Sequence, residues 1–189
     1  MRKLNSYAAD MIPVRLIISI AVIAAIVLMF SFGYMNLRVY LSEGSINDDI
    51  TYLESNLLNV IASGVARDVD ETDASDGTKR LMSFDIPDNI NFIAFGCDPD
   101  ENNDGILESG LFETGNNIFY KVEGGSKKVF WLSSDYKFRE GIYDSGKWTI
   151  NNPSQGFIIK KPGKIKIVFE LVERFNEKNI LIQSTDILN

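Results

Sequence analysis

The sequence predicts an α+β protein with an N-terminal transmembrane helix, an amphipathic helix, and an antiparallel β-sheet or β-sandwich as its outer domain. Three observations support this prediction: an uncharged apolar run, a helical periodicity after it, and strand-like alternation in the second half of the chain. They divide the 189 residues into four parts. The expected parts are a cytoplasmic leader (1–15), a transmembrane helix (16–35), a linker with an amphipathic helix (36–67) and an extracytoplasmic β-rich domain (68–189).

The apolar run covers residues 16–34 and contains no charged residue. A helix rises about 1.5 Å per residue, so a run of this length crosses a hydrocarbon layer of roughly 30 Å. Basic residues precede the run (Arg2, Lys3 and Arg15), which predicts a cytoplasmic N-terminus and an outer C-terminal domain. The run is longer than an ordinary secretory signal and no clear cleavage site follows it, so we expect it to be retained.

A second helix is expected after a break at residues 43–45, with Ser45 as its N-cap and Asp48 three residues later. It would run for about twenty residues, toward Arg67. Its apolar residues recur at spacings of three and four. They are Ile46, Ile50, Leu53, Leu57, Val60 or Ile61, and Val65. We expect the sheet of the outer domain to cover most of this stripe, and the same helix in neighbouring subunits to cover the rest.

The second half of the chain alternates with the period of β-strands and is divided by turns rich in Gly, Asn and Asp. The expected strands cover residues 80–86, 90–95, 117–123, 128–133, 137–142, 148–151, 157–160, 164–172 and 179–184. Residues 164–171 alternate most regularly. Their predicted inner face is Ile165, Ile167, Phe169 and Leu171, and their predicted outer face is Lys164, Lys166, Val168 and Glu170.

Composition argues against several classes of function. Three of the 19 basic residues and one of the 26 acidic residues precede the span, so the remainder carries 16 basic and 25 acidic residues. This negative charge disfavours nucleic-acid binding. The chain has no His, hence no Ser-His or Cys-His pair, and we expect it not to be an enzyme. Its single cysteine, Cys97, is expected to be a half-buried structural thiol, with pairing between chains as the alternative.

The loop after residue 97 is the strongest candidate site. Oxygen-bearing side chains alternate there and Gly105 permits a sharp turn, a pattern typical of Ca²⁺ loops. The candidate ligands are Asp98, Asp100, Asn102, Asp104 and Glu108, with Glu113 as an alternative to Glu108. Such a site would be structural. The alternative is a solvated acidic turn without metal, and no other cofactor is expected.

The second acidic loop and a set of four aromatic residues each allow a purely structural interpretation and a binding interpretation. The second acidic loop favours simple solvation, although a joint metal site of both loops stays open; its acids are Asp68, Asp70, Glu71, Asp73 and Asp76. Four aromatic residues favour core and cross-strand packing, and a sugar-binding surface is the alternative. They are Trp131, Tyr136, Tyr143 and Trp148.

The segments AADMIPVRLIISIAVIAAIVL, SGVARDVD and IPDNINFIAFG make the chain resemble archaeal type IV pilin-like membrane-anchored proteins of uncharacterised function. The resemblance implies a structural or binding role at the cell surface, with the lipid bilayer, other pilin-like subunits or surface-layer components as partners. Pilin precursors usually carry a Glu five residues into the mature chain, whereas the first Glu here is Glu43. We therefore expect an anchored pilin-like protein, with a processed pilin or minor pilin of a filament or secretion apparatus as the alternative.

Overall fold

The computed structural model describes residues 6–71, 74–108, 115–151 and 155–184. The chain divides into two compact units, Met1–Tyr40 and Leu41–Asn189. One helix, α1 (Ser6–Ser63), contributes residues to both units. We describe each unit by itself.

The helix in the first unit is exposed over most of its described length. Every residue from 14 to 38 is exposed, including the large apolar side chains. The most apolar window of Val14–Ser63 has a mean hydropathy of 2.7 and none of it is buried. Within the part of the chain that the structure describes, α1 is the one helix long and apolar enough to cross a membrane.

The predicted break at residues 43–45 is wrong, because Gly44 and Ser45 lie inside α1 and Ser45 is not an N-cap. A glycine inside a helix costs about 1 kcal/mol relative to alanine. Burial of Ile46 and Ile50 immediately after it offsets that cost. The helix also ends at Ser63, earlier than predicted, and at Gly64 a Cβ would lie 2.1 Å from the carbonyl oxygen of Val60. Glycine is therefore the residue that this helix end accommodates.

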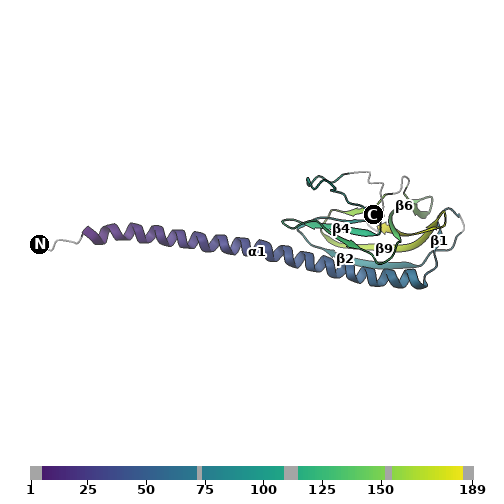
Figure 1. Cartoon of the computed structure of the whole chain (residues 1–189), viewed down its shortest axis with the longest axis horizontal. Helices are drawn as coiled ribbons and strands as arrows, with labels where there is room; N and C mark the ends of the chain where they lie inside the picture. The colour runs from purple at the N-terminus through teal and green to yellow at the C-terminus, as the bar shows by residue number, and fades with distance from the viewer. Residues whose placement is uncertain (1–5, 72–73, 109–114, 152–154, 185–189) are drawn as a thin grey trace. The chain divides into compact units, whose positions relative to one another are not determined.

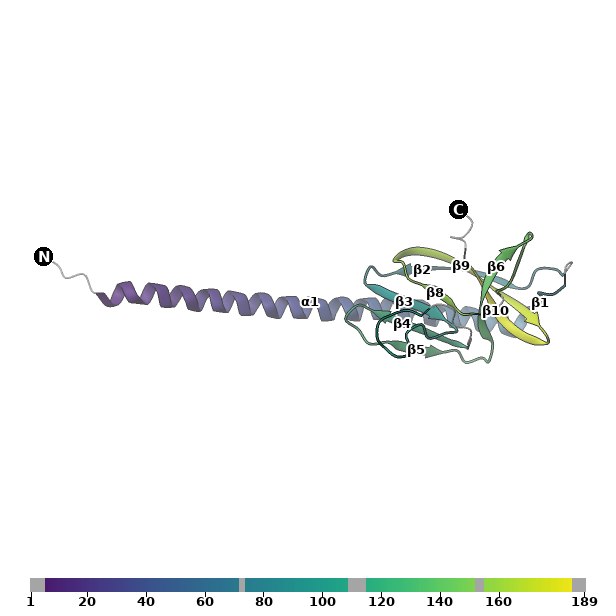
Figure 2. The ribbon, with the colours of Figure 1, turned by 90° about the horizontal axis from the view of Figure 1, so that it is seen from above.

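The second unit contains two β-sheets. The larger sheet has the order β1 (Arg67–Asp68), β9 (Gly163–Arg174), β10 (Glu177–Ser184), β6 (Lys137–Asp144) and β7 (Lys147–Ile150), and β2 (Lys79–Ile86) also pairs with β9. The smaller sheet has the order β5 (Lys128–Trp131), β4 (Asn117–Val122), β3 (Ile90–Phe95) and β8 (Phe157–Ile159). Figure 2 shows β3, β4 and β5 on one side of this unit and β2 and β9 on the other.

All the predicted strands are present, with ends shifted by at most two residues. The prediction of purely antiparallel pairing is wrong for the larger sheet, where β1 is parallel to β9 and β10 is parallel to β6. Parallel neighbours need a long crossover, and the chain between β6 and β10 provides one through β7, β8 and β9. Strand β1 was not predicted, because its two residues stand beside an acidic loop without any alternation.

The core of this unit joins helix and sheets. The predicted stripe is confirmed: its buried members are Ile46, Ile50, Leu53, Leu57 and Val60. Ile61 is half-buried, whereas Val65 is 69% exposed because the helix ends before it. The second half of α1 runs beside β2 (Figure 1), with Ser42 bonded to Asn89 beyond one end of β2.

Aromatic rings connect the two sheets. Phe95 of β3 lies 6.1 Å from Phe84 of β2, 5.5 Å from Phe138 of β6 and 6.0 Å from Phe169 of β9, between ring centroids. The β9 alternation is confirmed for Ile167, Phe169 and Leu171. One prediction for this strand is wrong: Glu170, assigned to the outer face, is 1% exposed.

Candidate functional site

The acidic loop (residues 97–108) follows β3 and is built from backbone-capping side chains. Asp98 accepts the N–H of Asp100 at 3.1 Å, and Asn102 accepts the N–H of Asp104 at 3.1 Å. Asp104 in turn accepts the N–H of Ile106 at 2.7 Å. Each side chain thus caps the backbone two residues later, which is the local bonding for which Asp and Asn are favoured in turns. The alternation seen in the sequence has this structural cause.

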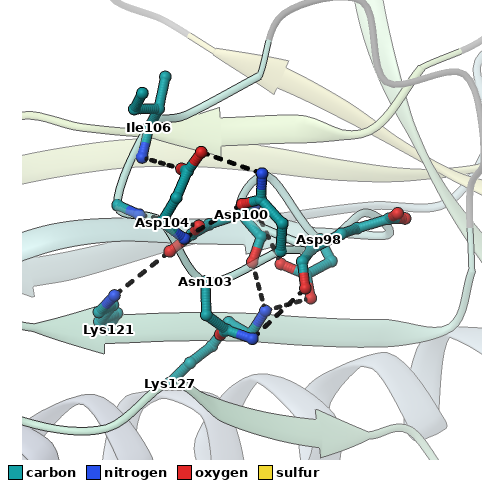
Figure 3. Close-up of polar contacts among 10 residues, drawn as sticks. Asp98, Asp100, Asn103, Asp104, Ile106, Lys121 and Lys127 are labelled. Carbon is teal, nitrogen blue, oxygen red and sulfur yellow. Dashed lines mark hydrogen bonds and ion pairs between the residues drawn. The ribbon is translucent and has the colours of Figure 1, made fainter.

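Two lysines form ion pairs with Asp98 and Asp100 of this loop (Figure 3). The Lys127 Nζ lies 2.6 Å from Asp98 Oδ2 and 2.5 Å from the carbonyl oxygen of Asp100. The Lys121 Nζ lies 3.2 Å from Asp100 Oδ2. Lys121 belongs to β4 and Lys127 to the turn after it, so a neighbouring hairpin delivers both cations to the loop.

The carboxyl of Asp100 is completely covered. Burial alone raises its pKa, but the N–H of Gly105 and the ammonium groups of Lys121 and Lys127 outweigh burial, so the pKa lies below its ordinary value. A lowered pKa in the folded state stabilises the fold above the unfolded pKa of about 3.9, and this contribution is lost as the pH falls. The loop therefore holds an ionised carboxylate.

The predicted Ca²⁺ ligands contact different partners in the structure. Asp98 and Asp100 share Lys127, whereas Asn102 donates to Asp104 at 3.0 Å. Glu108 is exposed and its N–H donates to Pro99 at 2.9 Å. Glu113 lies outside the described residues. Among the described residues, no three His, Cys, Asp or Glu side chains converge into a group that could hold a metal ion.

Cys97 is the first residue of this loop and is buried. Burial raises the pKa of its thiol to about 12, and the charges of Asp98 and Glu140 contribute to the increase. Because the thiolate is the reactive form, burial and the raised pKa both disfavour reaction of this thiol. Cys97 is more completely buried than the half-buried thiol that the sequence predicts.

A second cluster, the Arg67–Glu170 pair, was missed by sequence analysis. Arg67 donates to both carboxylate oxygens of Glu170, at 2.8 and 2.9 Å, and to the carbonyl of Trp148 at 2.9 Å. Gly77 N–H and Gln183 complete the bonding of Glu170, at 3.0 and 2.6 Å. Both charges are buried, so this pair fixes β1 and the chain before β2 onto β9.

A small cleft of about 230 Å³ lies beside this pair. Lys79 and Lys147 line it, and Asp76 forms a 2.8 Å ion pair with Lys79. Asp68, Asp70 and Glu71 of the second acidic loop are exposed, as predicted, and Asp70 lies 3.3 Å from Arg174. Asp73 lies outside the described residues.

The four candidate aromatic residues are distributed over different elements. Tyr143 and Trp148 form a cross-strand pair between β6 and β7, with ring centroids 5.6 Å apart, which confirms packing for these two. Trp131 is exposed on β5 of the smaller sheet. Tyr136 is half-buried and stands in the chain just before β6.

A basic turn connects β8 to β9 across the two sheets. It consists of Lys160, Lys161, Pro162, Gly163 and Lys164, all of them exposed. The turn borders a shallow groove of about 400 Å³ whose remaining lining is mainly apolar, including Phe157 and Ile165. Sequence analysis assigned only a turn here, although its density of lysines was visible.

Comparisons with known protein families, with curated proteins and with solved structures find no match to this chain.

Proposed function

We propose that this chain is a single-pass membrane protein, pilin-like in architecture, that holds its β-domain outside the cytoplasm in a structural or binding role. The observation that carries the proposal is the exposed apolar half of α1. Every residue from 14 to 38 is exposed, although the stretch is almost entirely apolar. Soluble monomers rarely expose contiguous apolar patches of more than a few hundred Å², so lipid or packed protein must cover this surface.

Charge supports the proposed orientation. Basic residues precede the span and a strongly acidic remainder follows it. Positive charge beside a span is retained on the cytoplasmic side, so the β-domain would be translocated. Arg15, exposed near the start of the apolar stretch, can extend its guanidinium to the headgroup layer.

A processed pilin subunit is the second candidate. The small residues Ala21, Ala24 and Ala25 are exposed on α1 and would let neighbouring copies of this helix approach closely. Arg15 argues for isolated anchoring, because a charge among packed apolar helices is costly unless it is paired.

The test combines carbonate extraction, protease protection and the mass of the mature chain in native membranes. Wild type should resist extraction, and external protease should remove the β-domain of intact cells. The double variant Ile23→Lys/Ile26→Lys should lose resistance to extraction, since each lysine at a helix centre costs about 2.5–3.5 kcal/mol. The matched control Ser145→Lys/Asn176→Lys adds the same charge to two exposed turns and should remain membrane-bound.

Mass distinguishes the two candidates. A chain that begins at Met1 or Arg2 supports the isolated anchor, whereas one that begins near Ala9 or Asp10 supports pilin-type processing. Complete release of wild-type protein by carbonate would refute both candidates.

A further inference from the structure

We propose that the basic turn between β8 and β9 binds anionic lipid headgroups; this proposal rests on the membrane anchoring proposed above. The turn and its flanks are unusual in charge. Residues 155–169 contain four lysines and no acidic residue, whereas the chain after the span has nine more acidic than basic residues. A local positive patch on an acidic domain is therefore available to a negatively charged surface.

Within the described part of the chain, the lysines of this turn have no acidic partner. Lys160, Lys161 and Lys164 are exposed, and none forms an ion pair within 4 Å with a described acidic residue. The strand register offers one acidic residue as a neighbour of this turn: Asp85, which stands opposite Lys164 in the β2–β9 pair. Lys160 and Lys161 precede that register and have no such counterpart.

The fold fixes this turn at one end of the second unit, the end that contains Leu41. Gly163 pairs with Ile86 at the end of β2, and Asn89, three residues later, bonds to Ser42 at 2.7 Å. Leu41 follows Tyr34, the last residue of the apolar run, by seven residues. Those residues are helical and span only about 10 Å along the helix axis. The connection from the apolar run to the end of the second unit that carries the basic turn is therefore short.

The opposite end of β9 provides an internal reference. The β9–β10 turn follows Arg174, eleven residues beyond Gly163, which corresponds to about 36 Å along an extended strand. Electrostatic attraction to a charged membrane decays within a Debye length of about 8–10 Å. The lysines predict headgroup contact at the basic turn, and the β9–β10 turn serves as the reference position.

The experiment measures proximity in vesicles that hold the full-length chain. Pro162→Cys places a fluorophore in the basic turn without removing a lysine, and Asn176→Cys places the same fluorophore in the β9–β10 turn. Cys97 is buried and has a pKa of about 12, so labelling is selective for the introduced thiol. The vesicles contain phosphatidylcholine alone or mixed equally with phosphatidylglycerol, with a headgroup spin label as quencher.

We expect several-fold stronger quenching at position 162 than at 176 in phosphatidylglycerol vesicles, decreasing in high salt and in pure phosphatidylcholine. The variant Lys160→Gln/Lys161→Gln/Lys164→Gln should abolish the difference between the two lipids. The control Lys137→Gln/Lys147→Gln/Lys178→Gln removes equal charge from exposed positions elsewhere and should preserve it. Added inorganic phosphate at constant ionic strength should not compete, which distinguishes a lipid surface from a site for free phosphate.

Equal quenching in the two lipids, or quenching unaffected by loss of the three lysines, would overturn the proposal. Flotation of the same vesicles reports anchoring separately. Protein that floats without lipid-dependent quenching refutes headgroup binding alone, whereas protein that does not float refutes the proposed anchoring.

Discussion

Two clusters in the β-domain pair carboxylates with cations, and they differ in how the partners reach one another. The Arg67–Glu170 pair joins residues 103 positions apart, and both side chains are nearly inaccessible. In the acidic loop, Lys121 and Lys127 come from only 21 and 29 residues away and keep 21% and 15% of their side-chain exposure. The first cluster is part of the core, and the second pairs two loop carboxylates with lysines that stay partly exposed.

The comparison teaches that the same ionic chemistry has different consequences at different depths. A buried charge that loses its partner cannot recover its hydration, whereas the Asp98 carboxylate, whose side chain is 17% exposed, regains water when Lys127 is removed. Substitutions that remove one cation at a time should therefore separate the two clusters.

The largest expected effect is that of Arg67→Met. It leaves the Glu170 carboxylate buried with only the Gly77 N–H and Gln183 as partners, and breaking a buried pair in this way costs about 3–5 kcal/mol. Chemical denaturation of the full-length chain in detergent micelles measures the loss. The double variant Arg67→Met/Glu170→Met should be more stable than the single variant, because it removes the unpaired charge as well.

Lys79→Met is the matched control for this prediction, since it removes a cation from the exposed pair with Asp76. Surface pairs contribute about 0–1 kcal/mol, so this variant should unfold nearly as wild type does. A loss as small for Arg67→Met would mean that the Arg67–Glu170 pair does not hold the core.

Lys127→Met should have an intermediate effect. It removes the contacts to Asp98 Oδ2 and to the Asp100 carbonyl, and hydrogen bonds to charged groups contribute about 1.5–3 kcal/mol when well formed. Because water replaces part of that bonding, we expect a loss of about 1–2 kcal/mol in the same denaturation assay. Lys121→Met should cost less, since its single contact is longer, at 3.2 Å, and Asp100 keeps its contacts to the Gly105 N–H and to Lys127; the reverse order would contradict the geometry.

The contrast between the clusters also explains what could be predicted from the sequence. Strands β2 to β10 and the stripe from Ile46 to Val60 were predicted, because each follows a local period of two or 3.6 residues. The same period of two places Glu170 on the outer face of its strand, so the pattern predicts that it is exposed. Its burial depends on an arginine from a two-residue strand that has no periodicity.

For the candidate site as well, the sequence predicted the local pattern but not the partner from a distant part of the chain. The alternation of Asp98, Asp100, Asn102 and Asp104 correctly indicated a tightly turned acidic loop. It could not indicate that a lysine lies against Asp98 and Asp100, because a separate hairpin provides that cation. The parallel pairing of β6 with β10 was beyond sequence analysis for a similar reason, since it is decided by a crossover and not by either strand alone.

The smallest expected effect tests the Ca²⁺ prediction for the acidic loop. In wild type, an ion at Asp98 and the Asp100 carbonyl would have to displace Lys127, so millimolar Ca²⁺ should change the melting temperature little. Lys127→Met frees both oxygens but provides few of the six to eight ligands that Ca²⁺ prefers. Binding would then be weak, and Ca²⁺ at tenfold Kd would restore about 1.4 kcal/mol.

The measurement is the melting temperature of both proteins after chelation and then across millimolar Ca²⁺, with Mg²⁺ at equal concentration as the control. A larger increase for Lys127→Met than for wild type, specific to Ca²⁺, would show that the lysine occupies the place of an ion. Equal increases with both cations would show charge screening of an acidic surface instead. An increase in wild type as large as in the variant would mean that the ion binds without displacing Lys127, and the ligands would then have to be sought among Asn102, Asp104 and Glu108.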